Sequence, residues 1–107
     1  MTTIQQLIDA NGGLADGQTL TVHVTGYNPL IIERDGNEIS VGFYATDADG
    51  EMHADPAVNF QVRGKVWTPV SMVIGDRVIN QPAYLRRFCR DWDQQLAADE
   101  FATATAQ

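Results

Sequence analysis

The densest group of side chains that could do chemistry lies between residues 47 and 55. Five polar residues occupy alternate positions there: Asp47, Asp49, Glu51, His53 and Asp55. If the segment is extended, this spacing places all five on one side, and carboxylates with a histidine could hold Ca²⁺, Mg²⁺ or a transition metal. The pattern departs from a calcium-binding loop, because Gly50 directly follows the second acid and no glutamate closes the loop. We therefore favour an exposed acidic hairpin and predict no bound metal or other cofactor.

Residue types suited to acid–base or nucleophilic catalysis are sparse. His23 and His53 are the only histidines, and a general base needs a partner within hydrogen-bond reach. The chain has neither a Gly-x-Ser-x-Gly elbow nor a phosphate-binding loop. Cys89 lies in an apolar pattern, which favours a buried thiol over a reactive thiolate stabilised by Arg86 and Arg90. The sequence predicts a protein that is not an enzyme.

Three arginines within one predicted helix form a basic face: Arg86, Arg87 and Arg90. One interpretation is a solvated helix surface with Arg87–Asp91 and Arg90–Gln94 pairs at i, i+4 spacing. The other is a partner-binding surface, because arginine forms forked hydrogen bonds to carboxylates and phosphates. Both interpretations remain open from the sequence.

The remaining charge is unevenly distributed along a chain of net charge −7. Residues 1–62 carry nine acids and one base, residues 63–90 six bases and one acid, and residues 91–107 four acids and no base. Long-range repulsion by phosphates disfavours direct nucleic-acid binding. We predict a partner-binding acidic rim made of Glu33, Asp35, Glu38, Asp47, Asp49 and Glu51.

Two helices at the ends of the chain frame these residues. Apolar spacing predicts a short helix over residues 3–11, with Thr2 or Thr3 as its N-cap. Pro82 is suited to the first turn of a long helix that reaches Phe101. One apolar stripe runs along this helix: Leu85, Phe88, Cys89, Trp92 and Leu96.

Alternating and β-branched residues predict strands between the helices. Their expected ranges are 19–25, 30–34, 39–46, 57–62 and 66–74, the last interrupted near Pro69. Asp35-Gly36 and Asp49-Gly50 are hairpin signals, and the second returns the chain to Met52 or to residue 57. Pro56 is expected at a strand start or edge, because proline has no N–H to donate to a ladder.

These elements predict one α+β domain over residues 1–101, followed by a frayed tail at 102–107. It consists of a short helix, an antiparallel meander of about five strands and a long C-terminal helix packed on one face. Trp67 and Trp92 are expected to be core residues in mutual contact, whereas Tyr27 is expected in an exposed turn. An open sheet edge allows strand pairing between copies, so monomer and homodimer both remain open.

No signal peptide is visible, and no apolar run approaches the roughly 20 residues needed to cross a bilayer. A single cysteine excludes an internal disulfide. We therefore expect a soluble, cytoplasmic protein without a membrane partner.

The order of several motifs resembles an uncharacterised bacterial family found largely on plasmids, phages and integrated elements. The matching segments are residues 27–33, 39–44, 50–60, 67–71, 85–88 and 92–93. The resemblance covers about residues 20–101 and implies no reaction and no catalytic residues. It implies an association with mobile genetic elements.

Three functions follow as hypotheses. The first is a non-enzymatic binding protein that inhibits a host nucleic-acid-targeting defence system, of the anti-CRISPR or anti-restriction type, with the acidic rim mimicking DNA phosphates. The second is an accessory protein of plasmid or phage replication or maintenance that binds a host or element-encoded protein, or nucleic acid, through the arginines. The third is a metal-dependent enzyme using the cluster between Asp47 and Asp55.

Overall fold

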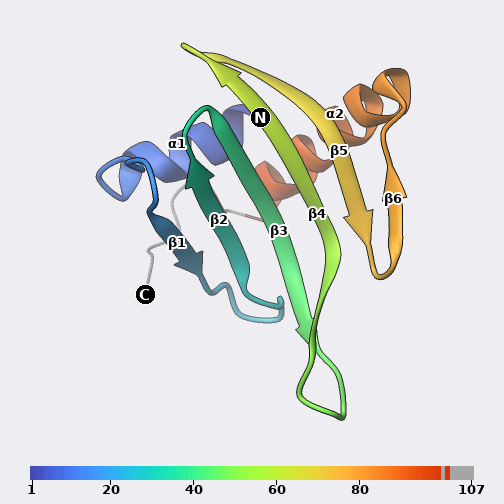
Figure 1. Ribbon diagram of the computed structural model, residues 1–107. Helices are drawn as coiled ribbons and strands as arrows, with labels where there is room; N and C mark the ends of the chain where they lie inside the picture. The colour runs from blue at the N-terminus through green and yellow to red at the C-terminus, as the bar shows by residue number, and fades with distance from the viewer. Residues whose placement is uncertain (100, 102–107) are drawn as a thin grey trace.

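The computed structural model describes residues 1–99 and residue 101. Their elements, in chain order, are α1 (Thr2–Ala10), β1 (Thr19–Val22), β2 (Leu30–Asp35), β3 (Glu38–Thr46), β4 (Met52–Arg63), β5 (Val66–Ile74), β6 (Arg77–Ile79) and α2 (Pro82–Ala98). The predicted tail at 102–107 lies outside the described residues. The α+β fold with a helix at each end is confirmed (Figure 1).

The strands form one antiparallel meander in which neighbours in sequence are neighbours in the sheet. It has six strands rather than about five, because residues 77–79 form an additional edge strand. β6 was missed since it is only three residues long and pairs only with the end of β5. A segment this short shows too little alternation to identify it.

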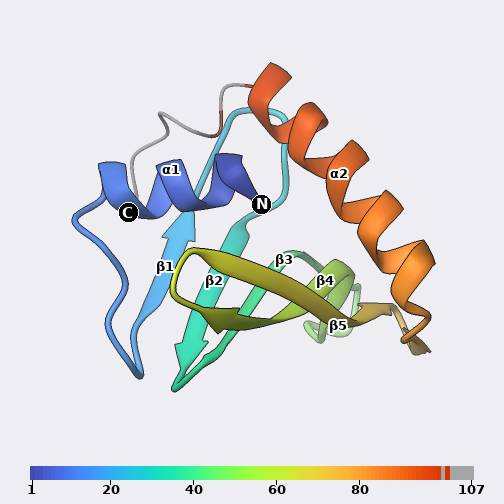
Figure 2. The same cartoon turned by 90° about the horizontal axis from the view of Figure 1, so that it is seen from above.

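Both helices cover the same face of the sheet (Figure 2), which places the core between the helices and the strands. Alternate strand residues point into it, and the apolar stripe of α2 is buried as predicted at Leu85, Cys89, Trp92 and Leu96, with Phe88 half-buried. The opposite face of the sheet carries most of the polar strand residues. No helix among the described residues is long and apolar enough to span a membrane.

Pro56 lies inside β4, so its expected place at a strand start or edge was wrong. The pairing of β3 with β4 shifts register between Gly42 and Tyr44, and this irregularity leaves Asp55 and Pro56 without paired residues on β3. Pairing with β5 begins only at Ala57. A bulge tolerates proline, because no ladder hydrogen bond is required there.

The predicted irregularity of β5 near Pro69 is confirmed. The β4–β5 register shifts between Asn59 and Phe60, whose partners are Ser71 and Pro69, so Val70 is left over. β5 nevertheless runs on as one element.

The N-cap prediction for the first helix was wrong, because α1 starts at Thr2 with Met1 as N-cap and no side-chain cap. Asp93 of α2 instead supplies hydrogen-bond acceptors at the N-terminal end of α1. The Thr3 N–H donates to Asp93 Oδ1 at 2.8 Å, and the Thr3 hydroxyl donates to the Asp93 carbonyl at 3.1 Å. A carboxylate at a helix N-terminus is favourable for both hydrogen bonding and the helix dipole.

The second helix begins at Pro82 as expected but ends at Ala98, short of Phe101. Phe101 lies beyond the helix and is buried against Tyr27 and Phe43, at ring-centroid distances of 5.3 and 5.6 Å.

The two tryptophans have separate aromatic partners. Trp67 packs on Phe60 at 5.4 Å, whereas Trp92 packs on Phe43 at 6.0 Å and Phe88 at 5.6 Å. No ring contact joins Trp67 to Trp92 among the described residues, so the predicted pairing was wrong. Trp67 is half-buried on β5 and Trp92 is buried on α2, so a contact between them depends on how the helix packs on the sheet, which the apolar pattern alone could not give.

Candidate functional site

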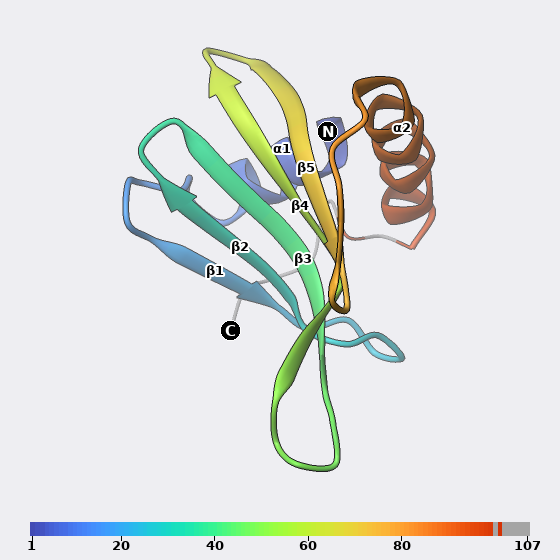
Figure 3. The same ribbon diagram turned by 45° about the vertical axis from the view of Figure 1, so that its right-hand side comes forward.

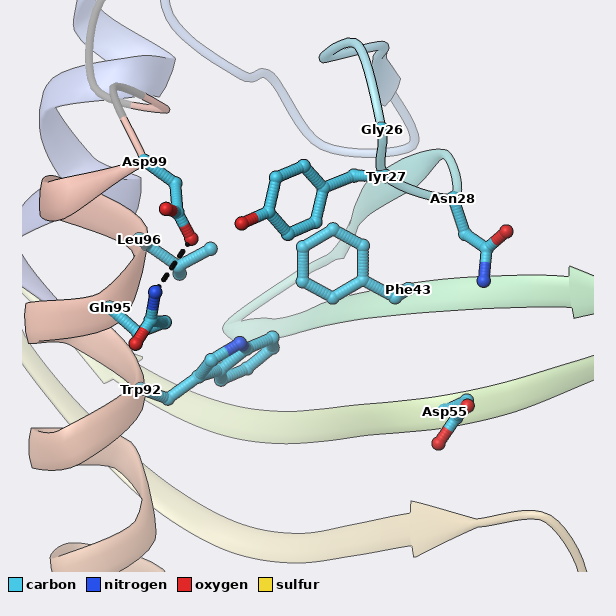
Figure 4. Close-up of a pocket in the computed structure, with 9 residues that line it drawn as sticks. All are labelled: Gly26, Tyr27, Asn28, Phe43, Asp55, Trp92, Gln95, Leu96 and Asp99. Carbon is cyan, nitrogen blue, oxygen red and sulfur yellow. Dashed lines mark hydrogen bonds between the residues drawn. The ribbon is translucent and has the colours of Figure 1, made fainter.

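The most complete candidate site is a pocket of about 500 Å³ between the loop before β2, the strands β3 and β4, and the C-terminal end of α2 (Figure 4). Its lining residues are Gly26, Tyr27, Asn28, Phe43, Asp55, Trp92, Gln95, Leu96 and Asp99. The volume is within the range of pockets that hold small ligands or side chains. Four separate parts of the chain meet here.

Three aromatic rings form the wall of this pocket. The rings of Tyr27 and Phe43 are stacked at 6.0 Å, and Phe43 meets Trp92 edge-on, also at 6.0 Å. Trp92 is buried, whereas Tyr27 is 44% exposed. The buried Phe101 packs edge-on against Tyr27 and Phe43. The pocket therefore offers an ordered aromatic surface with one ring partly open to solvent.

A hydrogen-bonded group stands at one side of the rings. The Gln95 side-chain amide donates to Asp99 Oδ2 at 2.9 Å, and the Tyr27 hydroxyl points toward the same carboxylate (Figure 4). Hydrogen bonds, first from Gln95 and then from Tyr27, lower the pKa of Asp99. The pKa of Tyr27 is raised, first by its hydrogen bond to Asp99 and then by burial. Asp99 is thus an anion at neutral pH, and Tyr27 keeps its proton.

A second carboxylate, Asp55, lies across the pocket on β4 (Figure 4). It sits in the bulge next to Pro56, and its side chain is exposed. No hydrogen bond joins the Asp55 carboxylate to another described residue. Since none of the nine lining residues is Lys, Arg or His, the pocket carries two negative charges without a balancing positive group.

The six carboxylates of the predicted acidic rim lie in two groups. Glu33, Asp35 and Glu38 surround the turn between β2 and β3, whereas the others belong to the loop between β3 and β4. These turns are at opposite ends of β3 (Figure 1), a nine-residue strand that spans about 26 Å at ~3.3 Å per residue. The rim is therefore two acidic ends rather than one surface.

The loop of residues 47–51 is held by its own carboxylate. Asp47 Oδ1 accepts the backbone N–H groups of Asp49 and Glu51 at 2.9 and 3.0 Å, and Asp47 Oδ2 lies 2.7 Å from His53 Nε2. These hydrogen bonds, that of His53 first, lower the pKa of Asp47. The loop projects away from both helices (Figure 3).

Only part of the predicted 47–55 cluster comes together. Ligand atoms of Asp47, Glu51 and His53 lie within 4.8 Å of one another, and all three residues are exposed. Asp49 does not join them, and Asp55 lines the aromatic pocket instead. The turn breaks the extended geometry that a spacing of two would require. Both oxygens of Asp47 already have partners, Oδ1 in the loop and Oδ2 at His53 of β4, so this carboxylate fixes the loop on the strand.

The three predicted arginines are exposed on the N-terminal half of α2. Arg90 Nε lies 4.0 Å from Asp91 Oδ1, and both side chains are 69% exposed. The expected Arg87–Asp91 and Arg90–Gln94 pairs are not formed among the described residues. Such an exposed, long ion pair contributes little to stability, and both interpretations of the basic face stay predictions.

Cys89 is buried as predicted. Burial raises the pKa of its thiol to about 11. Burial therefore opposes a thiolate at neutral pH and favours the buried thiol over the nucleophile interpretation.

Comparison of the chain with family models, with curated proteins and with solved structures gives no match. The resemblance to a mobile-element family therefore stays a prediction.

The sequence interpretation missed the aromatic pocket. It identified Tyr27 as an exposed turn residue and Trp92 as a core residue, but it assigned Asp55 to the acidic hairpin. Gln95 and Asp99 were not identified, because a polar residue near the end of a helix carries no local signal that distinguishes a site from an exposed surface. The available signal was an exposed aromatic in a Gly-Tyr-Asn-Pro turn, which indicates a contact residue but not its neighbours.

Proposed function

We propose that this chain is a small, non-enzymatic binding protein that docks on a positively charged surface of a partner protein. The observation that carries the proposal is the aromatic pocket, where three rings and two carboxylates meet without a cationic lining residue. Carboxylates and ring faces both attract cations. The net charge of −7 adds long-range attraction to a basic partner.

The protonation states favour binding over proton transfer. An efficient general acid or base has a pKa near the working pH. In this pocket the pKa of Asp99 is lowered and that of Tyr27 is raised, so both move away from neutrality. A carboxylate at Asp99 that stays negative, beside a Tyr27 that stays neutral, suits the recognition of a permanent cation.

The specific form of the proposal is an inhibitor of a host nucleic-acid-targeting defence system. A basic groove that binds a phosphate backbone is a surface that an acidic protein could cover. The two acidic ends of β3, around Glu38 and Asp49, would steer the approach. The charge layout and the resemblance to a mobile-element family support this form.

A quantitative pull-down from a bacterial lysate, followed by mass spectrometry, tests the proposal. We expect one partner to be retained by the wild-type chain and lost with the double variant Asp55→Asn/Asp99→Asn. The control Asp76→Asn, in the β5–β6 turn, also removes charge but lies outside the pocket. A partner retained equally by all three proteins would place the working surface elsewhere.

The arginines of α2 support a second candidate, an accessory protein of replication or maintenance. Arg86, Arg87 and Arg90 are all exposed, and such a surface could bind phosphate or an acidic protein. This hypothesis predicts DNA binding that weakens steeply with salt. The binding should be lost with the variant Arg86→Glu/Arg87→Glu/Arg90→Glu. An electrophoretic shift assay at low salt that shows no complex would contradict the nucleic-acid form.

The metal-dependent enzyme remains a separate hypothesis based on Asp47, Glu51 and His53. Calorimetric titration with Zn²⁺, compared between wild type and His53→Ala, would test it. The same heat of Zn²⁺ binding for both proteins would contradict a metal site that uses His53.

A further inference from the structure

We infer that the aromatic pocket binds an arginine side chain of the partner, with its guanidinium held by Asp55 and stacked on the exposed aromatic surface. The inference rests on the proposed function, since it names the chemical group that the same pocket would take.

The distribution of charge selects a cation. Asp55 and Asp99 lie on two sides of the pocket, and no basic side chain lines it (Figure 4). Gln95 and Tyr27 already hydrogen-bond to Asp99, so this carboxylate supplies charge in a fixed orientation. Asp55 has no hydrogen-bond partner among the described residues. The Asp55 carboxylate, which is free to accept hydrogen bonds, therefore lies opposite the Asp99 carboxylate, which already accepts them.

The aromatic wall selects a flat, weakly hydrated cation. Tyr27, Phe43 and Trp92 together give the pocket an apolar side. A guanidinium is planar, stacks on aromatic faces and is less strongly hydrated than an ammonium group. A lysine ammonium would lose more hydration on entering beside these rings. The methylene groups of an arginine side chain could in turn pack on the rings.

The polar rim of the pocket suits a group with many donors. A guanidinium has five N–H donors and no acceptor. Besides the Asp55 carboxylate, the pocket contains the side-chain amides of Asn28 and Gln95, each with a carbonyl oxygen that can accept. A quaternary ammonium has no N–H donor and would leave these oxygens unused. Arginine is the side chain that uses both the rings and the acceptors.

NMR titration of the folded chain with N-acetyl-arginine amide tests the inference directly. We expect saturable shifts of the Trp92 indole N–H and of the Tyr27 ring protons. The parallel probes are N-acetyl-lysine amide, which should bind more weakly, and tetramethylammonium, which should be weaker still. Tighter binding of either parallel probe, or no saturable shift with the arginine probe, would overturn the inference.

A matched pair of isosteric variants assigns the contact. Asp55→Asn should weaken binding of the arginine probe about tenfold, because a carboxylate with two acceptor oxygens becomes a neutral amide with one and the charge-assisted hydrogen bond is lost. Asp76→Asn removes the same charge from an exposed turn outside the pocket and should leave affinity unchanged. Equal weakening by both variants would mean that only net charge acts. Unchanged amide spectra elsewhere would show that both variants are folded.

Competition separates this inference from the proposed function. If a partner depends on Asp55 but the arginine probe neither binds nor competes, the arginine assignment is wrong and the docking function stands. If the probe binds in an Asp55-dependent way but no partner depends on the pocket, the arginine site stands and the docking function is wrong.

Discussion

The two halves of α2 carry charges of opposite sign in different surroundings. In the N-terminal half, Arg86, Arg87 and Arg90 are exposed on one helix face, and two of them line a smaller pocket of about 230 Å³ beside Trp67. In the C-terminal half, Trp92 is buried, and Asp99 follows the helix beside aromatic rings from two other segments. The same helix thus presents a basic surface and a lined pocket.

The difference shows that charge density alone is a poor guide to a binding site. The arginines attract attention in the sequence because they are adjacent, but exposed charges are screened and contribute little individually. The pocket has only two charges, both accessible to solvent, but they lie at the edge of a wall of three aromatic rings on which a bound cation could stack. Surroundings, rather than the number of charges, distinguish the two halves.

Removal of a ring from the pocket wall should have the largest effect. Trp92 is 8% exposed and packs on Phe43 and Phe88, so Trp92→Ala should lower the free energy of unfolding by about 3–5 kcal/mol. Alanine at Arg86 or Arg87 should change it by no more than about 0.5 kcal/mol. Urea denaturation measures both. Similar losses of unfolding free energy for Trp92→Ala and for the arginine variants would mean that the two halves of α2 do not differ in their contribution to the fold.

A methyl group added between β3 and β4 should have the next largest effect. A Cβ at Gly42 would lie 2.6 Å from the Ala57 Cβ and 2.9 Å from the Ala57 Cα. Gly42→Ala should therefore destabilise the fold by about 1–3 kcal/mol through overpacking. Thermal unfolding checks this, and Gly42→Ala/Ala57→Gly should recover part of the loss. No recovery would mean that the contact with the Ala57 Cβ is not the cause.

A smaller loss is expected where α2 meets α1. Asp93→Ala removes the acceptor of the Thr3 N–H and should cost about 1 kcal/mol, as for the loss of an N-cap. Asp91→Ala, two residues earlier on an exposed position, is the matched control and should be nearly neutral. Chemical denaturation of the two variants compares them. If they lose the same amount, the link between the helices contributes no stability.

Cys89 should have no titration effect at neutral pH and a measurable one in alkali. Burial raises the pKa of its thiol from 9.0 to about 11 in the folded chain. Above pH 9 the unfolded chain ionises first, so the contribution of Cys89 to stability should be constant below pH 9 and should fall as pH rises toward 11. Denaturation across this range, with Cys89→Ser as control, measures the effect. The same alkaline loss in the control would assign it to another group.

Much of the fold could be predicted because its signals are local. The stripe from Leu85 to Leu96 repeats at helical spacing, and Asp35-Gly36 joins two alternating segments, so neighbours in sequence were enough to identify α2 and the β2–β3 hairpin. Burial of Cys89 followed from the same stripe. Features that depend on fewer residues, such as β6 and the helix ends, were missed or displaced.

The site could not be predicted in the same way, because its parts come from distant positions. Tyr27, Asp55 and Asp99 have unrelated local patterns, and only the order of the meander and the placement of α2 bring them to one pocket. The acidic rim is divided into two groups for the converse reason: its residues share a charge, but β3 separates them.

Local periodicity and turn chemistry determined the elements, the buried helix face and the charge of each segment. Tertiary structure alone decided that Asp93 meets the start of α1, that Asp55 leaves the acidic loop for the aromatic pocket, and that Tyr27 lies beside Asp99. The physical reason is the distance along the chain over which each effect acts. Backbone propensity and alternation act over a few residues, whereas a pocket depends on strand register, bulges and the packing of a helix that follows the whole sheet in the chain.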